Sequence, residues 1–327
     1  MDFCTIVSET KRIINAHSRH FLALSVLFLL PLSFSFVVLP TLQDLLIDSF
    51  PNNSKIFVAR TDFASQLDEP IISSKTLWLV SAYSLFTFFF SLCAVGSITY
   101  SVFHGFYGRP VKLISAIKST FFSFFPLLGT VIVVDMITFA ITILFLIILF
   151  LVIRGVELLG FETEFSSPYF LGLFLVLAIV LIVVLLYLQV IWNLSFVVVV
   201  VESKWGLQSL RRSASLIKGM KRVAVSLQLI FVIFAAIFLL ASYSTVRLVD
   251  VSDGWKRWEF VLQIVGTSSF LMMVLLYNLA SNTVLYMYCK AIHGELAFEI
   301  AEEFAREYVC FPFDDEKVPH LVSVVYA

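Results

Sequence analysis

Long apolar runs alternate with short polar stretches along this chain, and the alternation predicts membrane-spanning helices. A helix crosses the hydrocarbon layer of a bilayer with roughly 20 apolar residues. Six runs reach this length, at about 21–40, 77–104, 121–153, 168–200, 223–246 and 259–289. The third and fourth are too short to divide into two spans each, so we expect long helices that tilt or project beyond the membrane. The predicted fold is therefore all-α, a polytopic membrane helix bundle with six transmembrane helices.

A basic island at residues 201–222 interrupts the apolar pattern and reads as an amphipathic helix. Its apolar side chains fall on one arc of a helical wheel: Trp205, Leu207, Leu210, Ala214, Leu216, Ile217 and Met220. A helix with an apolar face beside a basic one is typical of the membrane interface. The candidate anionic-lipid interface consists of the basic residues of the island, Lys204, Arg211, Arg212, Lys218, Lys221 and Arg222.

Similar amphipathic blocks precede the first, third and fifth spans, at residues 13–16, 113–116 and 216–219. Each block is followed by a pair of spans, which predicts three repeated units of interfacial amphipathic helix plus transmembrane hairpin. The units cover about 1–107, 108–202 and 203–294, within a single membrane domain. An alternative is that basic amphipathic segments commonly precede helices that enter from the cytosol, although the nearly equal spacing favours a repeat.

Composition excludes a soluble domain, because 60% of the residues are hydrophobic and only 14% are charged, against roughly 45–50% and 25% in soluble proteins. Lys and Arg concentrate in the N-terminal segment, the second and fourth loops and the tail, which by the positive-inside rule predicts that both termini are cytosolic. The membrane is either an endomembrane or the plasma membrane. Asn52 begins a glycosylation sequon in the first non-cytosolic loop, and its use is left open. A second sequon, at Asn193, falls inside the fourth span, out of reach of glycosylation.

An acidic residue lies in the middle of the third apolar run, at Asp135, with Thr138 on the same helix face. Counted from the cytosolic end, Asp135 is about as deep as Gln189 and Asn278, and Asn282 shares a face with Asn278. These five residues form a candidate intramembrane polar cluster. One interpretation is a proton, cation or polar head-group site. The other is that the polar groups satisfy one another and fix helix packing.

No catalytic, cofactor-binding or metal-ligand motif occurs in the sequence, so we expect neither an enzyme nor a cofactor. The basic island suits anionic lipid better than nucleic acid, and no nucleic-acid partner is expected. Residues 295–327 form an acidic tail whose first part has the spacing of an amphipathic helix. That helix either docks on the basic island or is solvated, the solvated state being the default.

The island also carries a resemblance to known proteins, through the patterns ESKWGL at 202–207, LRRS at 210–213 and LIKG at 216–219. It resembles a family of uncharacterised plant multi-pass transmembrane proteins and, more distantly, the membrane region attached to bacterial glycerophosphoryl diester phosphodiesterases. The resemblance implies an all-helical membrane bundle and transfers no site residues, because no catalytic domain accompanies it here.

We therefore expect a membrane protein without catalysis, which organises or senses lipid or membrane-protein partners through cytosolic interfacial helices. The alternative is a small-solute or ion transporter or channel that uses the polar layer around Asp135.

Overall fold

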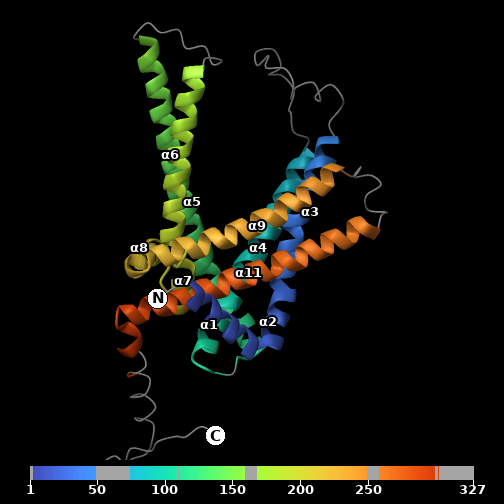
Figure 1. The fold of residues 1–327 in the computed structure, drawn as a ribbon, viewed down its shortest axis with the longest axis vertical. Coiled ribbons are helices and arrows are strands. Elements are labelled where there is room, and N and C mark those ends of the chain that lie inside the picture. Colours follow the sequence, from blue (N-terminus) through green and yellow to red (C-terminus); the bar gives the residue numbers. More distant parts are fainter. Residues whose placement is uncertain are drawn as a thin grey trace, which may run out of the picture.

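The computed structural model describes residues 3–48, 74–109, 111–158, 168–248, 258–298 and Ala301, and the elements in this part of the chain are all helical (Figure 1). The elements are α1 (Phe3–Ala16), α2 (Ser18–Leu24), the π-helix η1 (Ser25–Leu29), α3 (Leu30–Asp48), α4 (Ser74–Phe106), α5 (Leu113–Leu158), α6 (Pro168–Trp192), α7 (Ser195–Glu202), α8 (Leu207–Leu216), the 3₁₀ turn η3 (Ile217–Gly219), α9 (Lys221–Leu248) and α11 (Trp258–Ile292).

The described helices include six that are long and apolar enough to cross a membrane, as the sequence predicts. These candidate spans are Ser18–Leu39, Leu77–Phe106, Leu113–Gly155, Phe174–Glu202, Lys221–Tyr243 and Phe260–Ile292. The prediction of an all-α, multi-pass membrane fold is confirmed at this level.

The amphipathic blocks fold in different ways. In the first unit the block ends the short helix α1, and in the third it consists of the end of α8 and the turn η3. Both are separate from the following span, because His17 and Met220 leave the helical conformation (φ −123° and −129°) before the span begins. In the second unit the block at 113–116 is the start of α5 itself, since neither glycine nor proline interrupts the chain before Pro126. The expected interfacial helix therefore continues directly into the third span.

Two of the expected spans contain irregular backbone. The first includes η1, immediately before Pro31, which has no amide hydrogen to donate to the preceding turn. The fourth, which we expected to be one long helix, is divided into α6 and α7 by a turn at Asn193 and Leu194. A break of this kind leaves carbonyl and amide groups that other elements must satisfy.

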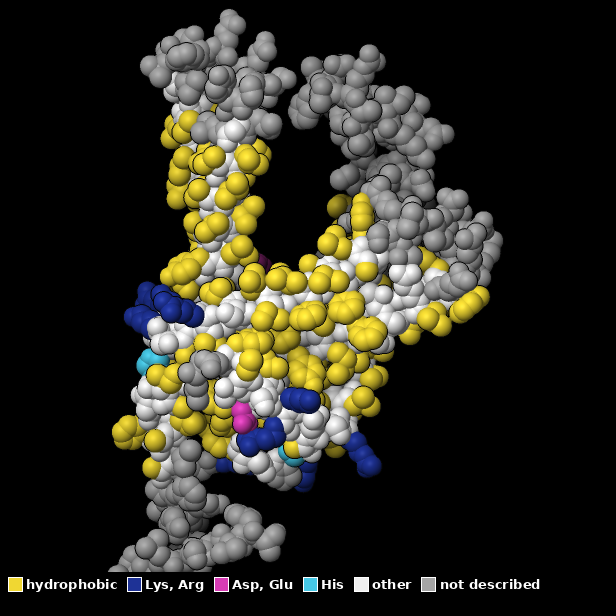
Figure 2. Space-filling view, in the orientation of Figure 1, with side chains coloured by type: hydrophobic (Ala, Val, Ile, Leu, Met, Phe, Trp, Pro, Cys, Tyr) yellow, Lys and Arg dark blue, Asp and Glu magenta, His cyan; other side chains and the backbone are white. Residues whose placement is uncertain are grey.

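The spans form two arms that share a base (Figures 1 and 2). One arm is the antiparallel hairpin of α5 and α6, and the other contains α3, α4, α9 and α11. Figure 2 shows an open gap between the arms, with apolar side chains on both edges. In the most apolar 18-residue stretch of each hairpin span none of the residues is buried, against 44% in the first span and 33% in the last.

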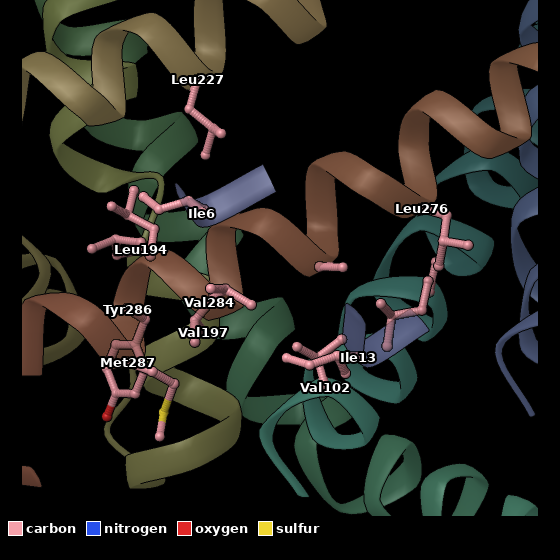
Figure 3. Packing of buried hydrophobic residues seen from close by; sticks show 14 of the residues in the cluster. Ile6, Ile13, Val102, Leu194, Val197, Leu227, Leu276, Val284, Tyr286 and Met287 are labelled. Carbon is pink, nitrogen blue, oxygen red and sulfur yellow. The ribbon is translucent and has the colours of Figure 1, made fainter. Parts of the chain in front are cut away.

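The core lies in the base, where segments far apart in the sequence meet (Figure 3). It joins Ile6 and Ile13 of α1, Val102 of α4, Val197 of α7 and the C-terminal half of α11. The α1 helix is therefore docked on protein through its apolar stripe. Its Thr10 is fully buried and accepts a hydrogen bond from Ser281 of α11, with the two hydroxyl oxygens 3.3 Å apart.

Candidate functional site

The basic island folds into α8 and the start of α9, and two backbone turns place it against α5. Ser203 has a positive φ of 55° and ends α7, and Gly206 at φ 63° begins α8. The Gly206 amide donates to the hydroxyl of Thr130 on α5 at 3.0 Å. Trp205 covers Gly129 of α5 so closely that a Cβ built on Gly129 would lie 3.2 Å from the indole ring.

The inner face of α8 is buried against the bundle through Ser209, Leu210, Ser213 and Leu216. The hydroxyl of Ser213 donates to the Ile191 carbonyl at 2.5 Å and so satisfies an acceptor that the break after α6 leaves open. This bond places α8 at the level of the break in the fourth span. The predicted apolar arc is thus divided, since Leu210 and Leu216 face the core while Trp205 and Leu207 are 61% and 54% exposed.

The outer face carries exposed cations beside these two exposed apolar side chains. We call this the basic surface, and it consists of Arg211, Lys218, Lys221, Arg222, Trp205 and Leu207. Figure 2 shows Lys and Arg side chains gathered over α8 at the foot of the hairpin. The Lys221 amine also lies 3.3 Å from the Tyr187 hydroxyl of α6, so that the surface extends onto the hairpin.

Two of the six predicted lipid-contacting cations are engaged within the protein. The guanidinium of Arg212 binds Glu202 through Nε at 3.2 Å and Glu295 through both terminal nitrogens, and the Lys204 amine lies 2.8 Å from the Glu202 carboxylate. The fully buried Tyr286 of α11 donates its hydroxyl to Glu202 at 2.8 Å. These contacts tie the end of α7, α8 and the end of α11 into one ion-pair cluster.

The ion-pair cluster shifts the pKa values of Glu295 and Arg212. Hydrogen bonding from Arg212 lowers the pKa of Glu295, outweighing the opposing effect of partial burial. The same bond raises the pKa of Arg212 above its ordinary value. Glu295 begins the predicted tail helix, so the tail contacts the island at this first residue. Residues beyond Phe298 lie outside the described part of the chain, apart from Ala301.

A network of side-chain amides joins the two arms at the break between α6 and α7. Asn193 donates to Asn282 at 2.8 Å and to Gln228 of α9 at 3.1 Å, and Asn282 donates to Asn278 at 3.1 Å. Asn282 is 5% exposed, whereas the other three are half-buried. This amide network uses polar groups to hold helices together where apolar packing gives no preference over lipid.

The structure brings together only part of the predicted intramembrane cluster. Asn278 and Asn282 are hydrogen-bonded as their spacing predicts, but their further partners are Asn193 and Gln228, which the prediction omits. The sequence did contain a signal for Asn193, because its polar side chain lies inside an apolar run. We interpreted that asparagine only as part of a sequon out of reach of glycosylation.

The other predicted members lie apart from the amide network. Asp135 and Gln189 are exposed and Thr138 is half-buried, and within the described residues none of these three side chains is hydrogen-bonded to Asn278 or Asn282. Asn52 lies outside the described residues. No group of three or more His, Cys, Asp or Glu side chains in the described part could hold a metal ion.

Six apolar helices, a polar network between their arms and a basic surface at one end define a multi-pass helical membrane protein. The chain belongs to the family described as Domain of unknown function (DUF8558), whose match covers residues 1–304. No curated protein and no solved structure matches it.

Proposed function

We propose that this protein is a non-catalytic membrane protein that binds anionic lipid head groups through the basic surface of α8 and α9. The observation that carries the proposal is the division of α8 into two faces. Its inner face is fixed to the bundle, while its outer side, with the adjoining Trp205, η3 and the start of α9, carries two exposed apolar side chains and four exposed cations. Cations attract lipid phosphates, and a Trp side chain suits the boundary between head groups and acyl chains.

The internal contacts of the island support a lipid-facing role for the remaining cations. Arg212 and Lys204 hold Glu202 and thereby fix α8, so we exclude them from the lipid-contacting set. The other four cations are exposed: Arg211 on α8 itself, Lys218 in η3, and Lys221 and Arg222 at the start of α9. A polybasic surface of this size contributes about 1 kcal/mol per cation near an anionic leaflet.

The orientation and the repeat belong to the same proposal. With the basic surface facing the cytosol, both termini are cytosolic, in agreement with the distribution of Lys and Arg. We also propose that the six spans descend from three repeated units. The separate helices α1 and α8 support the first and third units, and in the second the interfacial helix has fused with α5.

The test is lipid retention by the purified full chain, measured by native mass spectrometry with phosphatidylserine or phosphatidylcholine added to the detergent. Replacing Lys218, Lys221 and Arg222 by Gln should reduce retained phosphatidylserine at least about fivefold and leave phosphatidylcholine unchanged.

The matched control replaces three exposed lysines elsewhere, Lys11, Lys112 and Lys118, by Gln. Equal loss of phosphatidylserine in both variants would show that net charge alone attracts the lipid, and the assignment to α8 would be wrong.

A further inference from the structure

The gap between the two arms begins where α4 and α5 separate. The two helices pack closely at Gly96, where an added Cβ would lie 3.3 Å from the Thr120 backbone, and at Phe89, whose ring centroid is 5.7 Å from that of Phe124. Leu92 and Leu127 are buried beside this contact. Beyond it both helices become exposed, and we call the space between residues 77–89 of α4 and 131–151 of α5 the fork (Figures 1 and 2).

Asp135 lies on the side of α5 that faces the fork. It follows Phe124 by three turns of helix, and at about 100° per residue the two side chains point within roughly 20° of each other. Phe124 contacts α4 directly, so Asp135 projects in the same direction past the point of separation. Thr138 follows at i+3 and extends the polar stripe along the same wall.

The opposite wall of the fork is apolar. Leu85 precedes Phe89 by one turn and continues the α5-facing side of α4, with 70% of its surface exposed. Phe86 is 45% exposed, and on the α5 side Phe139, one turn after Asp135, is 67% exposed. One carboxylate therefore stands among apolar side chains at the base of a gap that opens laterally to the bilayer.

The Asp135 carboxylate lacks a counter-charge in the described part of the chain. It is exposed and makes no hydrogen bond or ion pair with the described residues. An acid on the surface of a membrane span is unfavourable unless a cation or donor accompanies it. A hard metal ion would need several oxygen ligands, and no group of three metal-ligating side chains exists in the described residues.

We propose that the fork binds an amphipathic amine, with its ammonium group on Asp135 and its apolar body between the walls of α4 and α5. The ammonium would donate to the carboxylate and to the Thr138 hydroxyl, while Leu85, Phe86 and Phe139 enclose the hydrocarbon part. The ligand enters from the bilayer through the open side of the gap. This site is separate from the basic surface, whose cations repel an amine, and it does not depend on the proposed function.

The experiment measures saturable binding of tritiated dodecylamine to the full chain in phosphatidylcholine nanodiscs, after subtraction of binding to empty nanodiscs. Dodecanol, which has the same chain without the charge, should show no saturable component. Asp135→Asn should weaken dodecylamine binding at least about tenfold, whereas Asp135→Glu should retain it. Because Asp135 is exposed, the Asn variant should fold normally, as verified by its thermal midpoint.

A second variant tests the walls of the fork without touching the carboxylate. Leu85→Trp adds volume opposite α5 and should weaken binding of dodecylamine, while Glu9→Gln removes a negative charge from α1 and should leave it unchanged. Unchanged binding in both Asp135→Asn and Leu85→Trp would overturn the proposal.

Two other results would also overturn it. One is equal saturable binding of dodecanol. The other is a cross-link from the Phe139→Cys variant to a transmembrane helix of another protein that persists in excess dodecylamine, which would show that a protein partner occupies the fork.

Discussion

The base of the molecule and the α5–α6 hairpin are both built from apolar helices, yet only the base has a core. The α6 helix contains almost exclusively large apolar side chains, and in the most apolar 18-residue stretch of either hairpin span none of the residues is buried. The spans that pack best, the first and the last, contain many Ser, Thr and Asn residues, such as Ser25, Ser281 and Asn282, which are buried at their contacts. In a bilayer, apolar surface gains little by leaving lipid, so small and polar residues decide which helices associate.

The largest expected effect follows from this difference. Phe21 is fully buried in the base, and Phe21→Ala should lower the free energy of unfolding by about 2–4 kcal/mol through loss of packing. Phe150→Ala, in the hairpin where the ring is 56% exposed, should change it by less than about 0.5 kcal/mol. Unfolding in increasing dodecyl sulfate measures both, and a large loss in the hairpin variant would mean that another protein covers that surface.

A smaller effect is expected where the basic island meets α5. Gly129→Val would force the Trp205 ring away and should lower stability by about 1–3 kcal/mol. Gly155→Val is the matched control, because an added Cβ there meets open space. Trp fluorescence of the two variants during thermal unfolding would show whether Trp205 is displaced, and an unchanged spectrum in Gly129→Val would contradict the contact.

The amide network should contribute less to the free energy of unfolding than the contact between Trp205 and Gly129. In a double-mutant cycle of Asn193→Ala and Asn282→Ala, we expect a coupling free energy of about 0.6–1.7 kcal/mol, the range for hydrogen bonds between membrane helices. Gln189→Ala alters an exposed amide on α6 and should have almost no effect. Zero coupling between the asparagines would mean that the network does not hold the arms together.

The smallest effect is pH-dependent. The pKa of Glu295 is lowered by Arg212, so the contact stabilises the fold above the ordinary glutamate pKa and is lost as pH falls through the lower folded value. The partly exposed pair should contribute less than about 1 kcal/mol. The thermal midpoint of Glu295→Gln should lie below wild type at pH 7 and approach it near pH 3, and a constant difference would contradict the linkage.

The lengths of the apolar runs predicted the number and position of the spans. A membrane helix needs a long apolar run, and such a run can be recognised from the sequence alone. These lengths could not predict the break at Asn193, since Asn-Leu-Ser in an apolar run is compatible with continuous helix until Ser213 of another segment binds the Ile191 carbonyl. That contact depends on tertiary structure.

The candidate site was predictable only in part for a similar reason. The four-residue spacing correctly paired Asn278 with Asn282, which share a helix face. Depth along the spans grouped Asp135 with Asn278, but depth says nothing about the direction in which a side chain points around its helix. Asp135 points toward the fork and away from the amide network, and two further members of its predicted cluster also lie apart from that network. Arg212 and Lys204 bind Glu202 and so leave the predicted lipid-contacting set. These orientations depend on the packing of α5 against α4 and on the position of Glu202 and Glu295 beside α8, which the sequence of one helix cannot reveal.

The unequal construction of the hairpin has a mechanical consequence. Its α5 side is one continuous helix of 46 residues, whereas its α6 side ends at the turn after Trp192, which can act as a hinge. If a change in bilayer thickness tilts the hairpin, α6 can follow by backbone rotation at the turn after Trp192. The continuous helix α5 can only tilt as a rigid body, so its whole length moves. The N-terminal part of α5 contains Gly129 and Thr130, which contact Trp205 and Gly206 at the start of α8. A tilt of α5 would therefore change the orientation of α8, so that membrane thickness affects how α8 lies on the bundle.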